Sequence, residues 1–308
     1  ELDQWQAFAH DIAMRNARDR EQRLRVEGAD AIGGKLAGFK PLRMLLSGGA
    51  GTGKSRCVRA IVSSMRRMLV EESHLSKEAA DKSCVLGAPT GCAAFQMKHG
   101  AATAHRCFGV GRGTFQPLGK DKKAKHQERF KWYKLSVLDE FSMLGRRFFG
   151  QIIFRLREIL GAKPKDFDEE CSFGGLGVIL AGHADQAKPI GDESIFKPGK
   201  YTGKAKMVDR DGRPTHPNVE ELVDYNRLAV QEFEDVVLLQ MVHRSNVAGV
   251  SKEVDEKLNG MSESERKLYQ EEAQKYMEVT HRLSTLDWNL ADHEWLSQRY
   301  VGTLQQTA

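Results

Sequence analysis

Glycine, lysine and serine occur together in a segment whose spacing suits phosphate binding. LLSGGAGTGKS matches G-x-x-x-x-G-K-[ST] from Gly48 to Ser55, between an apolar run and a helical pattern. Glycines let backbone N–H groups surround phosphate oxygens, and the N-terminus of the following helix favours negative charge. We expect an ATP site in which Lys54 reaches the β- and γ-phosphates and the Ser55 hydroxyl binds Mg²⁺; the alternative is a glycine-rich turn that matches by chance. The loop backbone comprises Gly48, Gly49, Ala50, Gly51, Thr52 and Gly53.

Two adjacent carboxylates follow another apolar run, in LSVLDEFSML. Asp139 would hold Mg²⁺ directly or through water, and Glu140 would polarise an attacking water molecule. An apolar run that ends in Asp-Glu is, on its own, more often a strand entering an exposed loop. In combination with the glycine-rich loop, the pair predicts hydrolysis of a nucleoside triphosphate.

Small polar donors are set among Gly and Ala in GAPTGCAAFQMKHGAATAHRCFGVG. The hydroxyls of Thr90 and Thr103 and the imidazole of His105 suit the phosphates of a nucleic-acid strand, and the small neighbours allow a backbone to approach closely. Phe108 could stack on a base, although an isolated phenylalanine is more often part of a core. The residue types alone leave DNA contact and a structural role equally open.

Strands that alternate with helices are expected to position these residues. Apolar runs predict strands in LRMLLS, SCVLGAP, KLSVLDE, GLGVILAG and FEDVVLLQ. Helical patterns occur in SRCVRAIVSSMRRMLVEE, in RRFFGQIIFRLREIL and in LDQWQAFAHDI, where the apolar face would be Trp5, Phe8, Ala9 and Ile12. This alternation predicts an α/β P-loop NTPase with a mainly parallel sheet flanked by helices.

The composition is that of an ordinary globular protein, with 40% hydrophobic and 29% charged residues among 308. No apolar run approaches the roughly 20 residues that span a bilayer, so no membrane partner is expected. The net charge of +5 permits a polyanionic partner without requiring one. The five cysteines form no C-x-x-C pair, which argues against a disulfide framework or a zinc site and favours a reducing, intracellular compartment.

The order and spacing of the motifs resemble the first RecA-like motor domain of a Pif1-family helicase, in superfamily 1B and close to RecD-like enzymes. LDQWQAF resembles the adenine-reading Q motif, with Gln6 as its glutamine. GGAGTGKS resembles motif I, APTGCAA motif Ia, GAATAHRCFGVG the Thr-x-His-x-x-Phe-Gly segment, and LDEFSML motif II. FGGLGVILAGHADQAKPI resembles motif III, LLQMVHRS motif IV with Arg244, and LDWNLADHEWLSQR a segment that precedes the second motor domain.

The resemblance implies an ATP-dependent DNA helicase that moves 5′ to 3′ along single-stranded DNA and unwinds duplex junctions ahead of it. It further implies ATP and Mg²⁺ as ligands, a monomer, a nuclear or alternatively mitochondrial location, and roles in DNA repair, recombination and telomere maintenance. Gln186 would contact the γ-phosphate and link it to the DNA site, and Arg244 would stabilise charge on that phosphate. The DNA path would be lined by Pro89, Thr90, Thr103 and His105.

Motif III departs from the family pattern Gly-Asp-Phe-x-Gln-Leu-x-Pro. Here it reads Gly-His-Ala-Asp-Gln-Ala-Lys-Pro, so His183 replaces the acidic residue and two alanines replace the apolar anchors. We expect a looser loop that affects the coupling of ATP to DNA more than ATP binding. The basic stretch KDKKAKHQERFKWYK is either a DNA-contacting accessory element or a solvated helix with Trp132 packing inward.

The expected organisation has an N-terminal helix with the Q motif and a linker (1–40), a RecA-like ATPase domain (41–250) with a surface insertion at about 197–218, and a helical extension (251–308). We find no candidate motifs of a second RecA-like domain after residue 260, so a fragment or a degenerate gene product is expected. Two other functions stay open: a nucleotide-binding DNA-binding or regulatory module without turnover, and an unrelated P-loop ATPase.

Overall fold

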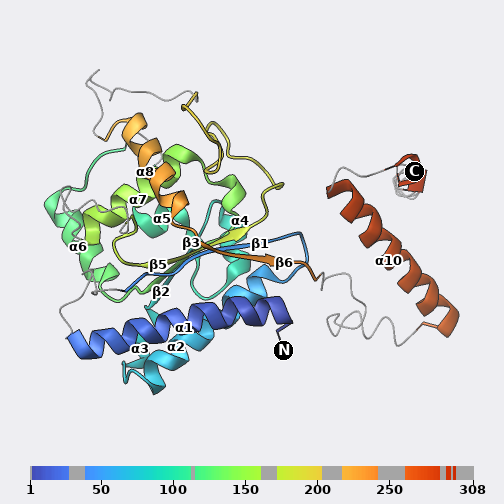
Figure 1. The fold of residues 1–308 in the computed structure, drawn as a ribbon, viewed down its shortest axis with the longest axis horizontal. Coiled ribbons are helices and arrows are strands. Elements are labelled where there is room, and N and C mark those ends of the chain that lie inside the picture. The colour runs from blue at the N-terminus through green and yellow to red at the C-terminus, as the bar shows by residue number, and fades with distance from the viewer. Residues whose placement is uncertain are drawn as a thin grey trace. The chain divides into compact units, whose positions relative to one another are not determined.

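The computed structural model divides the chain into two compact units, residues 1–241 and 242–308. In the second unit, helix α10 (Glu263–Ser284) accounts for the helical character expected there (Figure 1). The residues that the structure describes are 2–27, 39–111, 115–160, 172–202, 217–241, 261–284, 289–292, 294 and 295.

The first unit is a six-stranded sheet covered by helices on both faces. Its strands are β1 (Arg43–Gly48), β2 (Cys84–Ala88), β3 (Ala102–Thr103), β4 (Leu135–Leu138), β5 (Gly177–Gly182) and β6 (Asp235–Leu239). Its helices are α1 (Gln4–Glu27), α2 (Lys54–Glu71), α3 (Lys77–Asp81), α4 (Gly91–Met97), α5 (Ala104–Phe108), α6 (Lys120–Phe130), the 3-10 turn η1 (Phe141–Met143), α7 (Arg146–Leu160) and α8 (Val219–Gln231).

The strands follow the order β3-β2-β4-β5-β1-β6, and every described pair of neighbours is parallel. The C-terminal ends of parallel strands meet at the same edge of a sheet, where ligands bind in folds of this kind. The register pairs Ser47 of β1 with Gly182 of β5, and Leu138 of β4 with Leu180 of β5. This architecture confirms the expected RecA-like α/β fold and brings the ends of the motif-bearing strands together.

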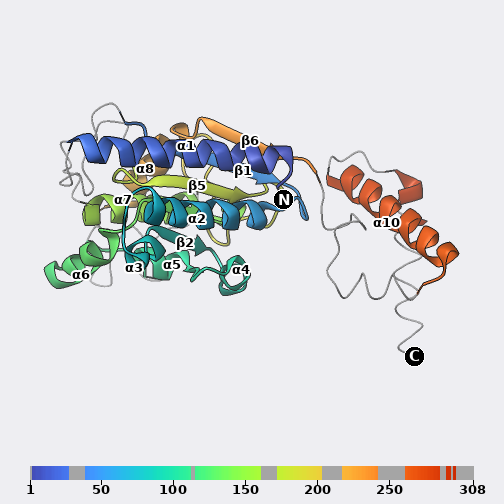
Figure 2. The ribbon, with the colours of Figure 1, turned by 90° about the horizontal axis from the view of Figure 1, so that it is seen from below.

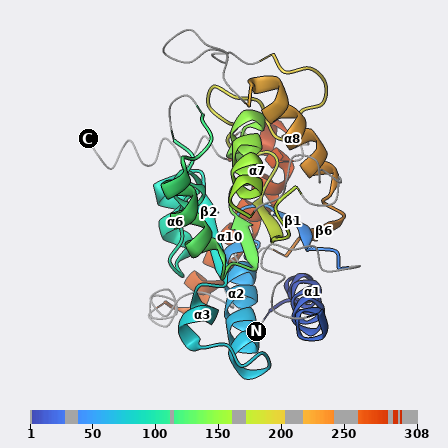
Figure 3. The same ribbon diagram turned by 90° about the vertical axis from the view of Figure 1, so that its left-hand side faces the viewer.

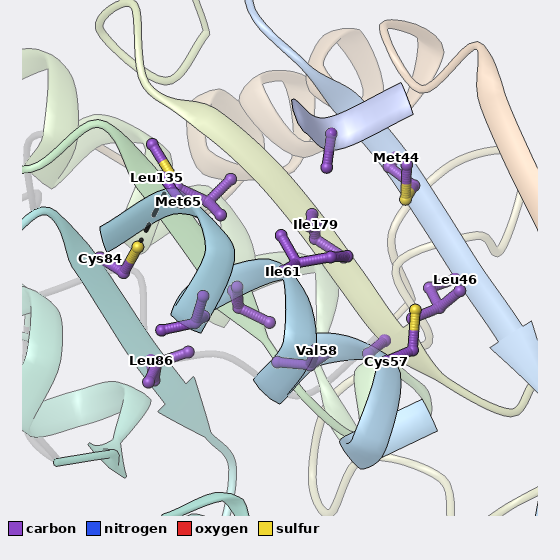
Figure 4. Packing of buried hydrophobic residues seen from close by; sticks show 14 of the residues in the cluster. Met44, Leu46, Cys57, Val58, Ile61, Met65, Cys84, Leu86, Leu135 and Ile179 are labelled. Atoms are coloured by element: carbon purple, nitrogen blue, oxygen red, sulfur yellow. Dashed lines mark hydrogen bonds between the residues drawn. The ribbon is translucent and has the colours of Figure 1, made fainter. Parts of the chain in front are cut away.

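Helix α2 packs its apolar stripe on one face of the sheet. Val58, Ile61 and Met65 recur at helical spacing and are at most 5% exposed, so they lie against strand residues such as Leu135 and Ile179 (Figure 4). Helix α1 runs beside α2 on the same face (Figure 2). Burial of these side chains, at about 1.5–3 kcal/mol each, fixes α2 and therefore the loop that precedes it.

Helices α7 and α8 cover the opposite face, as Figure 3 shows with α6 beside them. The stripe of α7 that includes Phe149, Ile152 and Leu156 is buried against β4 and β5. Gly150 allows the close approach of α8, because a Cβ atom at this position would lie 1.9 Å from the carbonyl oxygen of Leu222. The contact between these two helices therefore requires glycine at residue 150.

Some expected details differ from the structure. The helix over the N-terminal segment is confirmed, but Trp5 and Phe8 are 38% and 48% exposed. Ala9 and Ile12 of the expected face do pack against the core, and Gln6 of the same helix is fully buried as well. Trp132 is 37% exposed, and Phe130 is the residue of the basic stretch that packs inward. The short strand β3 was not predicted, since two residues give no periodic signal.

Four cysteines in the described ranges are free thiols, three of them buried. Desolvation raises the pKa of the Cys57 thiol to about 12, so this group is an inert part of the core. Across the described residues, no helix has both the length and the apolar character needed to cross a membrane.

Substituting alanine for Gly150 is expected to destabilise the first unit by about 1–3 kcal/mol, although alanine normally favours a helix, because the backbone of α8 cannot yield easily. Gly91→Ala is the matched control, since a Cβ atom there meets no atom within 4 Å. Urea denaturation followed by circular dichroism measures both. Equal stability of the two variants would contradict the role given to Gly150.

Candidate nucleotide and DNA site

The glycine-rich loop connects β1 to α2 at the C-terminal edge of the sheet. Gly51 and Gly53 adopt left-handed φ values of 83° and 82°, which favour glycine. A Cβ atom on Gly48 would lie 2.6 Å from the Thr52 hydroxyl and 2.9 Å from the carbonyl oxygen of Leu239 in β6. The loop is therefore folded tightly against the end of the neighbouring strand.

The N-terminus of α2 offers the donors that a phosphate requires. Gly53 is its N-cap and supplies no side-chain hydrogen bond, so the first turn of this 18-residue helix is not capped by its own N-cap residue. The Lys54 Nζ donates to the carbonyl oxygens of Gly48 and Gly49 at 2.7 and 3.0 Å, which places its charge over the loop. Ser55 is half-buried in the same turn. This arrangement fits a polyphosphate and a magnesium ion.

Gln6 is fully buried behind the loop. Its Nε2 donates to the carbonyl oxygen of Thr52 at 3.1 Å, and its Oε1 accepts from the N–H of Asp3 at 3.4 Å. Asp3 in turn accepts from the N–H of Gln6 at 2.9 Å, which forms a reciprocal cap at the start of α1. In this structure the amide of Gln6 supports the glycine-rich loop. The spacing of Asp3 and Gln6 is a sequence signal for this cap that the motif comparison did not use.

The two adjacent carboxylates lie where β4 ends. Burial, and secondarily the neighbouring charge of Glu140, raise the pKa of Asp139 to about 6, while the positive charge of Lys54 acts in the opposite direction. Asp139 is 8% exposed, and its N–H donates to the carbonyl oxygen of Gly87 in β2. Glu140 has a left-handed φ of 53°, an uncommon conformation for a residue with a side chain. Asp139 thus lies within electrostatic range of Lys54, the residue that follows the glycine-rich loop.

The motif III loop leaves β5 directly beside the carboxylates. A Cβ atom on Gly182 would lie 2.8 Å from both the backbone nitrogen and the ring of Phe141, the residue after Glu140. Beyond this contact the chain turns through a hydrogen bond from Gln186 N–H to the His183 carbonyl oxygen at 3.3 Å. The Oε1 atom of Gln186 is buried and has no hydrogen-bond partner among the described residues. A buried acceptor of this kind is costly unless a ligand or water satisfies it.

The residues expected along the DNA path follow β2 and β3 at the same edge. The hydroxyl of Thr90 caps α4 by accepting from Ala93 N–H at 3.2 Å, and that of Thr103 caps α5 by accepting from Arg106 N–H at 3.4 Å. Pro89 is half-buried next to Thr90. The structure therefore gathers this group at one edge and gives both threonines a local structural role.

His105 and Phe108 differ in their surroundings. His105 is half-buried and stacks on Phe148 of α7, with ring centroids 4.2 Å apart and an interplanar angle of 22°. Phe108 is 0% exposed and packs near Phe130, so the expectation that it stacks on a base is wrong. A side chain must be accessible to stack on a base. Phe108 is buried in the core under α7, so it cannot stack on a base in this structure. Arg244, and residues 203–216 of the expected insertion, lie outside the described residues.

Comparison with known proteins identifies proteins that this chain resembles. The sequence model of the PIF1-like helicase family matches residues 29–199, more than half of the 308 residues. The ATP-dependent DNA helicase PIF7 of Trypanosoma brucei brucei is 30% identical over 174 residues, which are 54% of this chain and 15% of that protein. The ATP-dependent DNA helicase PIF1 of Candida albicans is 29% identical over 151 residues, 48% of this chain and 14% of that protein.

Among solved structures, Bacteroides Pif1 bound to ssDNA matches with 17% identity and a TM-score of 0.44, covering 85% of this chain and 47% of that one. The Pif1 helicase from Candida albicans matches with 17% identity and a TM-score of 0.46, covering 84% of this chain and 43% of that one. The chain thus spans less than half of either structure and a small fraction of each curated relative.

Gln6→Ala is expected to weaken nucleotide binding about tenfold, equivalent to ~1.4 kcal/mol, because the Thr52 carbonyl loses its donor and the loop loses support. Titration with a fluorescent ATP analogue measures the affinity. Asn16→Ala is the matched control, since Asn16 also lies on α1 but bonds to Lys40 and Leu42, ahead of β1. If both variants weaken binding equally, the effect is a general loss of α1 packing.

Asp139→Asn is expected to raise the free energy of unfolding by about 1–3 kcal/mol at about pH 7.5 and to have little effect near pH 4. The pKa of Asp139 is raised from 3.8 to about 6, so the folded protein holds this proton more tightly than the unfolded chain. That stabilisation is complete below pH of about 4 and is lost as the pH rises through about 6.

Urea denaturation at both pH values measures this effect. Asp224→Asn, which changes an exposed carboxylate on α8, is the control and should alter stability by less than about 0.5 kcal/mol. A gain for Asp139→Asn that is independent of pH would contradict a buried charge at this position.

Proposed function

Because the chain belongs to the PIF1-like helicase family, we propose that it is the ATPase motor domain of an ATP-dependent DNA helicase. The observation that carries this proposal is that five motif segments meet at one edge of a parallel sheet. They are the glycine-rich loop, the carboxylate pair, the motif III loop and the two segments that follow β2 and β3. The proposed ATP site would span the ends of β1, β5 and β4, and the proposed DNA path the ends of the neighbouring strands β2 and β3.

In the proposed site, the loop backbone and the N-terminus of α2 bind the phosphates of ATP. Lys54 neutralises their charge, and Ser55 and Asp139 would hold Mg²⁺, which when bound offsets charge on the phosphates. Glu140 would polarise the attacking water. The raised pKa of Asp139, about 6, means that its carboxylate binds a cation best above that pH.

Three further residues have proposed roles around the phosphates. Gln186 would contact the γ-phosphate by donating from its amide Nε2, because its buried, unpartnered Oε1 can only accept a hydrogen bond from a donor such as water. The adenine-reading role that the Q motif implies for Gln6 would require its fully buried amide to exchange a present bond, to Thr52 or Asp3, for the base. Arg244 would stabilise charge on the γ-phosphate.

Single-stranded DNA is the proposed second substrate, bound along Pro89, Thr90, Thr103 and His105. Movement in the 5′ to 3′ direction, unwinding at duplex junctions, a monomeric state and a nuclear or mitochondrial location follow from family membership as proposals. A nucleotide-binding module without turnover is the second candidate function. It is favoured by His183, which stands in place of the family's acidic residue and lies 3.9 Å from Asp185.

Lys54→Ala is expected to lower ATP hydrolysis by at least about 100-fold, because the substrate phosphates lose their principal positive charge. The assay compares hydrolysis by the 308-residue chain with and without single-stranded oligonucleotide, and stimulation by DNA is the expected result. Lys77→Ala, at an exposed lysine in the first turn of α3, is the control and should retain full activity.

The direction of movement is tested on duplexes that carry a single-stranded tail on either the 5′ or the 3′ side. Unwinding that requires the 5′ tail supports the proposed polarity. Nucleotide and DNA binding without hydrolysis would instead favour the module without turnover. Absence of both binding activities would contradict both candidate functions.

A further inference from the structure

The segment after the motif III loop supplies the cap of helix α7. Asp192 Oδ1 accepts from the N–H of Arg147 at 3.4 Å, and its Oδ2 accepts from the N–H of Phe148 at 3.2 Å. These are donors of the first turn of α7, which an N-cap side chain normally satisfies. The residue in the N-cap position is Gly145, which has no side chain, so the cap comes from a residue more than forty positions away.

Neighbouring contacts hold Asp192 in this position. Its Oδ1 also accepts from the Tyr201 hydroxyl at 3.1 Å. The next residue, Glu193, accepts through its carbonyl oxygen from Arg146 N–H at 2.8 Å and pairs through its carboxylate with the Arg146 guanidinium at 3.1 Å. The side chains of that pair are 3% and 9% exposed, so the pair is sheltered from screening by solvent.

The absence of a side chain at Gly145 leaves room for the carboxylate of Asp192. A Cβ atom on Gly145 would lie 2.2 Å from Oδ2 and 2.4 Å from Cβ of Asp192. Gly145 also forms an antiparallel bridge with Ser194. Any larger residue at position 145 must therefore displace Asp192, including its Cβ atom, from the end of α7.

The capped turn of α7 lies between two parts of the proposed site. It follows Asp139, Glu140 and η1 directly in the chain, while Phe148 in this turn stacks on His105 of the proposed DNA path. Asp192 itself follows Gln186 by a short loop. The chain itself thus links the motif III loop to Asp192, and hydrogen bonds and ring stacking link Asp192 through the first turn of α7 to His105.

We propose that Asp192 is a positioning residue that couples the nucleotide site to the DNA path. Because its carboxylate bonds to the backbone of α7, a displacement of the motif III loop is transmitted to Phe148 and from there to the ring of His105. The inference rests on the proposed function, since it requires that ATP and DNA bind at these two places. Asp192 contacts neither ligand in this proposal.

The test measures coupling between two binding events. The affinity of the 308-residue chain for a labelled oligothymidylate is measured by fluorescence anisotropy, with and without a saturating non-hydrolysable ATP analogue. The ratio of the two dissociation constants is the coupling factor, for which about 5–150 is typical of allosteric proteins. Asp192→Ala should bring the factor below about 2 while each ligand alone binds with unchanged affinity.

Four variants separate coupling from a general loss of stability. Gly145→Ala should reproduce the effect of Asp192→Ala, because it displaces the same carboxylate. Asp192→Asn keeps one acceptor and should give an intermediate factor. Tyr201→Phe removes only one hydrogen bond to Asp192 and should lower the coupling factor by a smaller amount. It tests the inference if Asp192→Ala and Gly145→Ala do not fold. Asn218→Ala removes the capping box of neighbouring α8 and should keep the wild-type factor despite a similar drop in melting temperature.

The outcomes distinguish this inference from the proposed function. A wild-type chain that binds neither ligand overturns both. A wild-type chain that binds both ligands without coupling, or variants that fold and keep the wild-type factor, overturn the inference and leave the proposed binding sites standing. Loss of coupling in Asn218→Ala to the same extent as in Asp192→Ala also overturns it, because the cause would then be helix stability.

Discussion

The parallel pairing of β1 between β5 and β6 is the constraint on which the site depends. It sets Gly48 beside Leu239 so closely that no side chain fits, and it pairs Ser47 with Gly182, from which the motif III loop departs. The loop that carries Lys54 and the loop that carries Gln186 therefore begin at one level of the sheet. Neither loop needs to be long to approach the other, because the backbone ladder has already aligned their starting points.

The site contains polar groups that the fold would be more stable without. Asp139 is ionised at neutral pH only against the cost of burial, and Gln186 holds a buried acceptor that no described residue satisfies. The two apolar cores on either face of the sheet offset these costs. The balance is typical of sites where stability is given up so that side chains are available to a ligand.

The strands and the loops that follow them could be predicted from the sequence, and the burial of individual helix residues could not. The glycine-rich loop, the carboxylate pair and the strands that carry them follow from short-range spacing, because each needs only its own segment to be recognised. The inward face of α1 and the burial of Phe108 depend on which distant elements pack there, so the exposed Trp5 and Phe8 were misjudged. The capping role of Asp192 was missed for the same reason.

Two side chains distant in sequence hold backbone groups at the edges of this site. Gln6 donates to the carbonyl of Thr52 in the loop before α2, and Asp192 accepts from the first turn of α7. Both side chains form hydrogen bonds with backbone atoms. Their contribution to the site therefore depends on the path of the backbone more than on the identity of nearby side chains. Motif III can therefore lose its acidic residue to His183 and still remain tied to α7, because the carboxylate that makes this connection lies further along, at Asp192.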